Sequence, residues 1–381
     1  MRRNYGSESQ RFESLRARFN WDKVSIAMRN IELKSFFASS KTGYDDLKIH
    51  TIQILRGIAV VSVVLFHAKS GLFRNGYLGV DVFFVISGYL IYPKLRIAVE
   101  NKKLKSFFLK RTLRLGIPLA VMICFTLPLI LIMGTWRSHQ QFIIQSVFTI
   151  LLLGNISAFL VSGGYFEPNS FMPLVHTWSL SVEEQFYIFA SILAKLKTKL
   201  LIYLLMIASI LTFIMFVHEK NIWESWMFYM LFPRLWEFGI GALSYDFLKT
   251  KNKNIRFGIS KIRISLALLL LILIFPRQLN PLLSTLAVVV LTTYITGICH
   301  ALKPKSNLLR WIGDRSYSIY LYHMPLLYIA KFSPLVYSNN RQIETLISLI
   351  FIFLVAHLSY KLFEKNLYSQ LLTKYENVMN V

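Results

Sequence analysis

The stretch RGIAVVSVVLFHAKSGLFRNGYLGVDVFFVISGY, residues 56–89, decides the fold class. It is almost wholly apolar, yet it carries a guanidinium (Arg56), an imidazole (His67) and a carboxylate (Asp81). A charged side chain at the centre of a bilayer costs at least about 2.5–3.5 kcal/mol, so such residues are rare and face the protein interior. The stretch therefore predicts a membrane hairpin whose polar groups are candidates for function.

The composition of the whole chain is that of a polytopic membrane protein. Of its 381 residues, 55% are hydrophobic and only 16% are charged, and the mean hydropathy is +0.49. Several apolar runs reach the roughly 20 residues with which a helix crosses a bilayer. We therefore predict an all-α fold, a polytopic transmembrane helical bundle.

The formal net charge of the chain is +24. Lys and Arg beside membrane spans fix the orientation of the chain and attract anionic lipids. We attribute the charge to contact with membrane lipids and expect no nucleic-acid partner. Four basic connections are predicted to be cytoplasmic: 94–114, 195–199, 249–263 and 303–315.

Eleven apolar segments set the topology. A crossing at every segment would place the basic connections 94–114 and 195–199 on opposite sides of the membrane. We therefore assign segment 142–161, interrupted at Gly154-Asn155, as re-entrant or peripheral. About ten spanning helices remain, with both termini cytoplasmic. The segments lie near residues 50–68, 77–93, 115–134, 142–161, 174–194, 199–217, 226–247, 264–276, 281–302, 316–332 and 345–363.

Three regions follow along the chain. Residues 1–48 form a basic cytoplasmic N-terminal extension, residues 49–365 a transmembrane domain, and residues 366–381 a cytoplasmic C-terminal tail. The extension lacks the apolar core of a signal peptide. Its composition is compatible with surface helices, with disorder, or with a true start at Met28.

Helical geometry relates the polar groups of the opening stretch. Arg56 and His67 are eleven residues apart, so they share one helix face, about 16 Å apart along the axis. Asp81 begins the returning helix at about the depth of His67. A carboxylate beside an imidazole fixes its tautomer and stabilises its charged form, which suits a general base. The alternative is a purely structural His–Asp hydrogen bond between two helices.

Two arginines lie at the predicted cytoplasmic entrance of the third helix. In LKRTLRL (109–115), Arg111 and Arg114 are at positions i and i+3 and therefore share a face. Paired guanidiniums bind phosphate groups well. The alternative for this pair is contact with lipid headgroups and a role in topology.

A dense polar stretch, HTWSLSVEEQFY (176–187), lies inside an apolar segment. Helical phase places His176, Ser179, Glu183 and Tyr187 on one face, with Glu184 pointing away. We expect this stretch to line a polar cavity, the alternative being a buried network that holds helices together. A later segment repeats the pattern with His323, for which a packing role is the alternative. The predicted cavity set is His176, Trp178, Ser179, Glu183, Glu184, Tyr187 and His323.

With these residues the chain resembles the membrane acyltransferase 3 family, over about residues 50–365. Five ordered motifs carry the resemblance: Arg56-x10-His67, GVDVFFVISGYLI (79–91), Arg111-x2-Arg114, HTWSLSVEEQFY (176–187) and YSIYLYHMPL (317–326). The chain lacks a G-x-S-x-G elbow, a Walker loop and an H-E-x-x-H zinc motif. We accordingly expect no bound metal.

The resemblance implies an integral-membrane enzyme of the bacterial inner membrane, an O-acyltransferase and most often an O-acetyltransferase. It implies acyl-CoA, usually acetyl-CoA, as the donor substrate, no permanently bound cofactor, and a hydroxyl of a surface polysaccharide or its lipid-linked precursor as the acceptor. It also implies that His67 is essential and that Arg111 and Arg114 contact acyl-CoA. We expect Arg56 to join them, and His67, oriented by Asp81, to be the base.

One feature of the sequence differs from the family pattern, and the predicted mechanism and function each have an alternative. Family members often end the last helix with Glu followed by Arg or Lys and then Pro, whereas Glu364 is followed by Lys365-Asn366. Some relatives carry an extracytoplasmic hydrolase-like domain, so this chain is expected to act alone or with a separate extracytoplasmic partner. A covalent acyl-enzyme on His67 or a serine is an alternative route. A transporter that flips a glycan or an acyl carrier is the alternative function.

Overall fold

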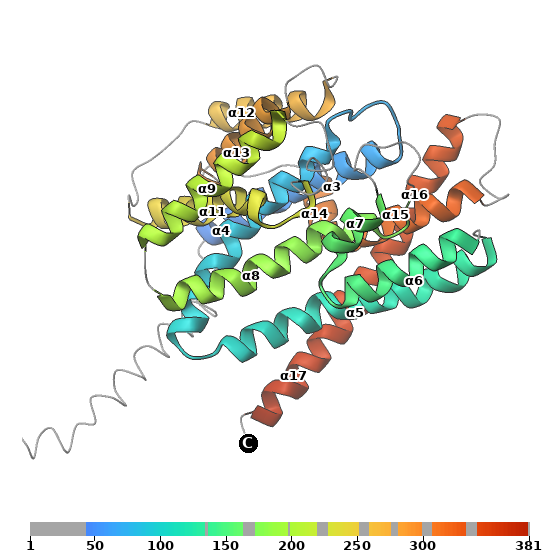
Figure 1. The fold of residues 1–381 in the computed structure, drawn as a ribbon, viewed down its shortest axis with the longest axis horizontal. Coiled ribbons are helices and arrows are strands. Elements are labelled where there is room, and N and C mark those ends of the chain that lie inside the picture. The colour runs from blue at the N-terminus through green and yellow to red at the C-terminus, as the bar shows by residue number, and fades with distance from the viewer. Residues whose placement is uncertain are drawn as a thin grey trace, which may run out of the picture.

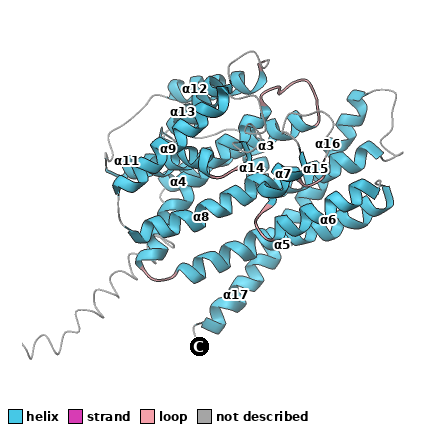
Figure 2. Ribbon diagram, in the orientation of Figure 1, coloured by secondary structure: helices cyan, strands magenta, loops and turns pink. Residues whose placement is uncertain are grey.

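The computed structural model is entirely helical in the part of the chain that it describes, without strands (Figure 2). This confirms the predicted all-α class. The described residues are 43–133, 136–162, 172–196, 199–218, 228–250, 259–275, 281–298, 307–332 and 341–379.

Three short 3-10 turns (η1 to η3) directly precede α4, α8 and α11, and a π-helical segment (η5) lies between α16 and α17. In chain order they are α3 (Gly43–His67), η1 (Gly76–Leu78), α4 (Gly79–Glu100), α5 (Leu104–Met133), α6 (Trp136–Ile150), α7 (Gly154–Ser162), η2 (Val175–Thr177), α8 (Trp178–Leu196), α9 (Lys199–His218), η3 (Phe232–Arg234), α11 (Leu235–Thr250), α12 (Ile259–Ile274), α13 (Pro281–Ile298), α14 (Asn307–Asp314), α15 (Ser316–Phe332), α16 (Arg341–Ser359), η5 (Tyr360–Leu367) and α17 (Tyr368–Met379).

Helices long and apolar enough to cross a membrane are present. Among the described residues there are 4 of them: His50–His67, Gly76–Glu100, Leu104–Ile132 and Gln342–Tyr375. Two shorter apolar helices cover Arg263–Ile274 and Leu283–Gly297. The protein is thus a membrane protein, and the count of about ten spans stays a prediction.

The segment predicted to be re-entrant or peripheral consists of two helices. α6 ends at Ile150, Leu152 adopts a left-handed turn with φ 61°, and α7 begins at Gly154 and has 9 residues. The interruption expected at Gly154 is therefore present, since the helix is interrupted directly before this residue. α6 has 15 residues, so neither helix has the length of a full span.

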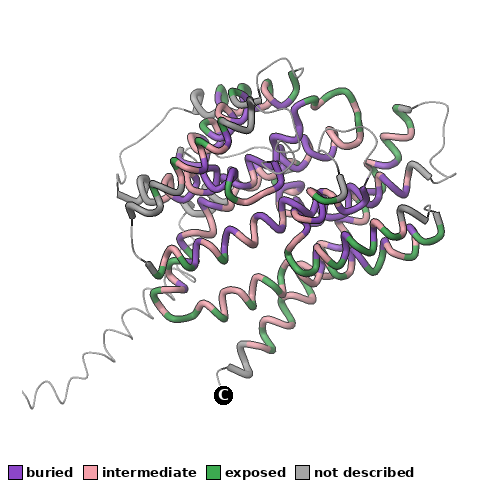
Figure 3. The backbone as a smooth tube through the Cα atoms, viewed as in Figure 1, coloured by how far each residue is buried: buried purple, intermediate pink, exposed green. Residues whose placement is uncertain are grey.

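The core of the bundle forms around α4, which packs against α3, α8, α11 and α13 (Figure 1). Two glycines let α4 and α11 approach closely: a Cβ on Gly88 would collide with the carbonyl of Phe238, and one on Gly241 with that of Val85. Figure 3 shows the buried residues concentrated in the central helices, with exposed residues on the outer faces of α5, α6 and α16.

Exposed residues on the outer helices are largely apolar. On α6 and α16 they include Ile143, Val147, Ile150, Leu354 and Leu358. Apolar side chains that face outward over several turns are what lipid chains cover. These faces therefore agree with the membrane assignment.

Two helices extend across the predicted boundaries between the regions. Most of the N-terminal extension, residues 1–42, lies outside the described residues, but α3 already begins at Gly43, before the predicted boundary at residue 49. The last long helix does not end at residue 365. It runs through η5 into α17 and ends at Met379, so most of the predicted tail is helical (Figure 1).

Candidate active site

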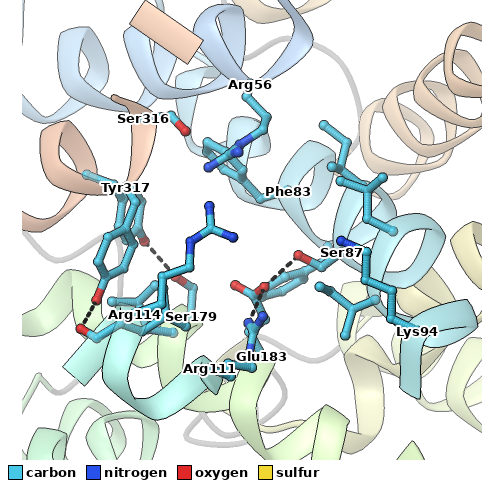
Figure 4. A pocket seen from close by; sticks show the side chains of 17 residues that line it. Arg56, Phe83, Ser87, Lys94, Arg111, Arg114, Ser179, Glu183, Ser316 and Tyr317 are labelled. Atoms are coloured by element: carbon cyan, nitrogen blue, oxygen red, sulfur yellow. Dashed lines mark hydrogen bonds and ion pairs between the residues drawn. The ribbon is translucent and has the colours of Figure 1, made fainter. Parts of the chain in front are cut away.

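A pocket of about 160 Å³ lies between α3, α4, α5, α8 and α15. Four cations line it: Arg56 from α3, Lys94 from α4, and Arg111 and Arg114 from α5. The pocket joins the motifs that the sequence singled out, although they lie far apart along the chain. Figure 4 shows Arg56, Lys94 and Arg114 pointing into it from different sides.

Arg111 is held by two carboxylates of α8. Its Nη2 donates to Glu183 Oε1 at 3.0 Å and its Nε to Glu184 Oε1 at 2.6 Å, while its guanidinium stacks on the Tyr187 ring, 3.8 Å from the centroid. The hydroxyl of Tyr187 donates to Glu183 as well. Arg111 therefore lines the pocket, but its charge is already balanced by protein carboxylates, which the sequence did not indicate.

The other three cations are more available to a ligand. Lys94 and Arg114 are exposed, and Arg56 is half-buried and donates to Gln53 Oε1 at 3.3 Å. Arg114 forms no hydrogen bond or ion pair with any residue that the structure describes. Three positive groups around one small pocket can bind a phosphate-bearing ligand through charge-assisted hydrogen bonds. Lys94 was missed because it belongs to a basic run that topology alone explains.

Polar contacts continue the pocket wall away from these cations. Ser87 Oγ donates to Glu183 Oε1 at 2.6 Å, and Ser179 Oγ lies 2.6 Å from the hydroxyl of Tyr320. The Tyr320 hydroxyl in turn donates to the carbonyl of His176 at 2.9 Å. Ser179 and Tyr320 both line the pocket, so a hydrogen-bonded wall connects it to His176. The sequence indicated Ser179 but not Ser87 or Tyr320.

Three histidines meet beyond Tyr320. His67 ends α3, His176 lies in η2 and His323 lies within α15. His323 Nε2 is 3.2 Å from His67 Nδ1, and the His176 and His323 ring centroids are 4.9 Å apart. The sequence placed His176 and His323 in the predicted cavity set and His67 beside Asp81, and in the structure His323 contacts both other histidines.

Asp81 does not have the partner that the sequence suggested. Its Oδ1 accepts from Arg234 Nη1 at 3.0 Å, and the same Nη1 donates to Glu237 Oε1 at 2.9 Å. All three side chains are buried. The predicted His67–Asp81 pair is thus replaced by an Asp81–Arg234 pair, because a buried carboxylate is better balanced by a guanidinium than by a neutral imidazole. Arg234 and Glu237 lie at positions i and i+3 in FPRLWEFGIGAL, a spacing at which helical side chains meet, and they form an ion pair.

Trp178 is a packing residue rather than part of the polar wall. Its side chain is fully buried, and its ring lies 4.9 Å from Phe228, 5.5 Å from Tyr229 and 6.0 Å from Phe84, measured between centroids. It opens α8, and Ser179 and Glu183 of that helix line the pocket. Trp178 therefore helps to hold α8 in place.

Glu364 lies where the last helix becomes π-helical. It accepts a hydrogen bond from Ser318 Oγ, and its charge lies near Arg56 and Arg114. π-Helical turns inside α-helices are frequent at functional sites. Glu364 therefore lies close to two of the cations that line the pocket.

Known proteins resemble this chain over most of its length. A family model described as an acyltransferase domain, acyltransferase 3, matches residues 49–361. A provisionally named O-acetyltransferase of Staphylococcus aureus is 32% identical over 303 residues, which are 72% of this chain and 50% of that protein. The provisionally named peptidoglycan O-acetyltransferase YrhL of Bacillus subtilis is 27% identical over 83% of this chain and 54% of its own length.

A third relative matches this chain over a larger share of its own length than the first two do. BcsY of Komagataeibacter xylinus, provisionally named a membrane-bound transacylase, is 27% identical over 82% of this chain and 81% of its own length. The chain spans about half the length of the staphylococcal relative and of YrhL. No solved structure matches the chain. The family match covers most of the chain and includes every motif around the pocket, and the chain therefore belongs to the acyltransferase 3 family.

Proposed function

We propose that this protein is a membrane O-acyltransferase that moves an acyl group, most simply acetyl, from acyl-CoA to a hydroxyl of a surface polysaccharide or its lipid-linked precursor. One observation carries the proposal: a pocket lined by cations is joined through Ser179 and Tyr320 to a cluster of three histidines. The first part suits a phosphate-bearing donor and the second suits proton transfer, as acyl transfer from a thioester requires.

The donor is assigned to the cationic part of the site. Arg56, Lys94 and Arg114 hold the phosphates of CoA by charge-assisted hydrogen bonds. Arg111 contributes differently from the expectation, since it is paired with Glu183 and Glu184 and fixes the wall on which Ser87 and Ser179 lie. The thioester end of the donor then points along this wall toward Tyr320 and the histidines.

The chemical step is assigned to His67. Its imidazole takes the proton from the acceptor hydroxyl while the oxygen attacks the thioester carbonyl. A carbon–oxygen bond forms, the carbon–sulfur bond breaks, and the proton passes from His67 to the departing CoA thiolate. Water must be kept from the thioester, and burial of His176 and His323 behind His67 supports such an enclosed site.

The names of the relatives support the acceptor class. YrhL is named for O-acetylation of peptidoglycan, and BcsY is named a transacylase. A glycan hydroxyl is the acceptor that the first of these names implies.

Replacement of His67 by Ala tests the function. We expect purified wild-type protein to release free CoA thiol from acetyl-CoA when a glycan acceptor is present, and the variant to lose at least about 10²-fold of this rate. Acyl groups on the surface glycan, measured by NMR, should be lost in cells that carry the variant at normal abundance. Binding of acyl-CoA without thiol release by the wild type would instead favour the transporter.

A further inference from the structure

The hydrogen bonds of His323 determine which of its ring nitrogens carries the proton. Its Nδ1 lies 2.5 Å from the backbone carbonyl oxygen of Tyr320. A carbonyl oxygen can only accept, so this Nδ1 must carry a hydrogen. His323 is fully buried, and an imidazolium buried without a carboxylate partner is costly. The neutral ring therefore has its lone pair on Nε2.

The lone pair of His323 in turn determines the tautomer of His67. His323 Nε2 lies 3.2 Å from His67 Nδ1. Because Nε2 accepts, the hydrogen in this contact belongs to His67 Nδ1. The His67 ring also has a hydrogen bond with the backbone of Val63, one turn earlier in α3. The lone pair of a neutral His67 is then on its Nε2, the nitrogen on the other side of the ring. His67 is half-buried whereas His323 is inaccessible, so His67 is the member of the pair that can meet a substrate.

We propose that His323 is the positioning residue of the acyl transfer: it fixes His67 in the tautomer whose Nε2 accepts the proton of the acceptor hydroxyl. When His67 becomes charged, its Nδ1–H still donates to His323, which stabilises the imidazolium. The inference rests on the proposed function. His323 thereby has the orienting role that was predicted for Asp81, whose carboxylate is paired with Arg234.

The position of His323 depends on a proline in the same helix. Pro325 has no backbone N–H, so it cannot bond to the carbonyl of Leu321 four residues earlier. His176 Nε2 donates to that carbonyl at 3.0 Å. The His176 ring thereby packs edge-on against His323, with an angle of 73° between the ring planes. Pro325 and His176 together hold the His323 ring in place.

Two replacements of similar size separate positioning from packing. Gln at position 323 can place an amide oxygen where His323 Nε2 accepts, whereas Met fills the space without an acceptor. We expect His323→Gln to keep the rate of thiol release within about 10-fold of wild type and His323→Met to lose about 10²-fold or more in kcat. The KM for acetyl-CoA should stay unchanged in both, because the cations are intact. Equal loss in both variants would overturn the proposal.

A second measurement does not depend on activity. The chain has 8 histidines, so protein labelled with 15N-histidine gives few signals, and His67→Ala identifies those of His67. We expect neutral His67 to show a protonated Nδ1 and an unprotonated Nε2 in the wild type and in His323→Gln, and the opposite or a mixture in His323→Met. A protonated Nε2 in the wild type would overturn the inference. A wild type with the expected tautomer but no thiol release would refute the proposed function instead.

Discussion

At the scale of single residues, the four cations of the pocket divide into two kinds. Arg111 is enclosed by two carboxylates and a tyrosine ring, and Arg114, one helical turn further, is exposed and lies near other positive charges. Arg111 differs from Arg114 because its side chain reaches the carboxylates of α8. One arginine therefore supports the architecture, and the other is available to a ligand.

Replacing these two arginines by Ala should have different effects. We expect Arg114→Ala to fold normally and to bind CoA about 10- to 100-fold more weakly, the value of a charge-assisted hydrogen bond. Arg111→Ala leaves Glu183 and Glu184 without their cation. It should lower the thermal unfolding temperature, although by less than the loss of about 3–5 kcal/mol expected for a fully buried pair, because these carboxylates keep 20% and 15% exposure. Calorimetric CoA binding and unfolding in detergent distinguish the two, and identical behaviour would contradict the division.

The buried Asp81–Arg234–Glu237 group has two carboxylates for one guanidinium. Loss of one carboxylate should therefore destabilise the protein less than loss of the guanidinium. Asp81→Asn leaves a balanced Arg234–Glu237 pair and should be tolerated, with thiol release within several-fold of wild type. Arg234→Met leaves two buried carboxylates without a cation and should lower the free energy of unfolding by about 3–5 kcal/mol. Thermal unfolding of the two variants shows which one is less stable. A normally folded Asp81→Asn protein without activity would bring back the pairing of Asp81 with His67.

At the scale of elements, the site depends on how closely α4 and α11 pack. The two helices touch through backbone, since both Gly88 and Gly241 face a carbonyl of the other helix. α4 carries Ser87 and Lys94 of the pocket, and α11 carries Glu237, which holds Arg234. A change in their separation would therefore move the pocket wall and the ion pair together.

A matched pair of alanine replacements tests this contact. Gly88→Ala places a methyl group against the backbone of Phe238, which cannot move aside easily, and should destabilise the protein by about 1–3 kcal/mol. Gly116→Ala in α5 is the control, because its Cβ would meet only Thr112 Cγ2 at 3.8 Å. That control should be neutral or slightly stabilising, since Ala favours helix more than Gly does. Equal unfolding temperatures for the two would mean that the close approach is unimportant.

At the scale of the whole molecule, the site would connect the two sides of the membrane. The cations lie at one end of the hydrogen-bonded wall and the histidines at the other, with Tyr320 between them. In the predicted topology, Lys94 and the start of α5 are cytoplasmic and the connection between α3 and α4 is external. Cytoplasmic acyl-CoA and an external acceptor would then reach the same site from opposite sides.

Labelling of single cysteines tests this orientation. In a background with Cys124 and Cys299 replaced by Ser, Lys103→Cys lies in the basic connection and Leu72→Cys in the α3–α4 connection, where Leu72 is 62% exposed. An impermeant thiol reagent added to intact spheroplasts should label Leu72→Cys and spare Lys103→Cys. Both should react after lysis. The reverse pattern would invert the topology and place the histidines on the cytoplasmic side.

Features that depend on local properties could be predicted from the sequence alone. Hydropathy established a helical membrane protein, the turn at Gly154 was visible as a break in an apolar run, and the Arg234–Glu237 pair followed from i, i+3 spacing. Contacts between distant groups could be read only from the packed helices. In the packed bundle, Asp81 pairs with Arg234, Arg111 pairs with Glu183 and Glu184, and His323 contacts His67. Each contact joins different elements, and no single segment encodes how these elements are rotated relative to one another.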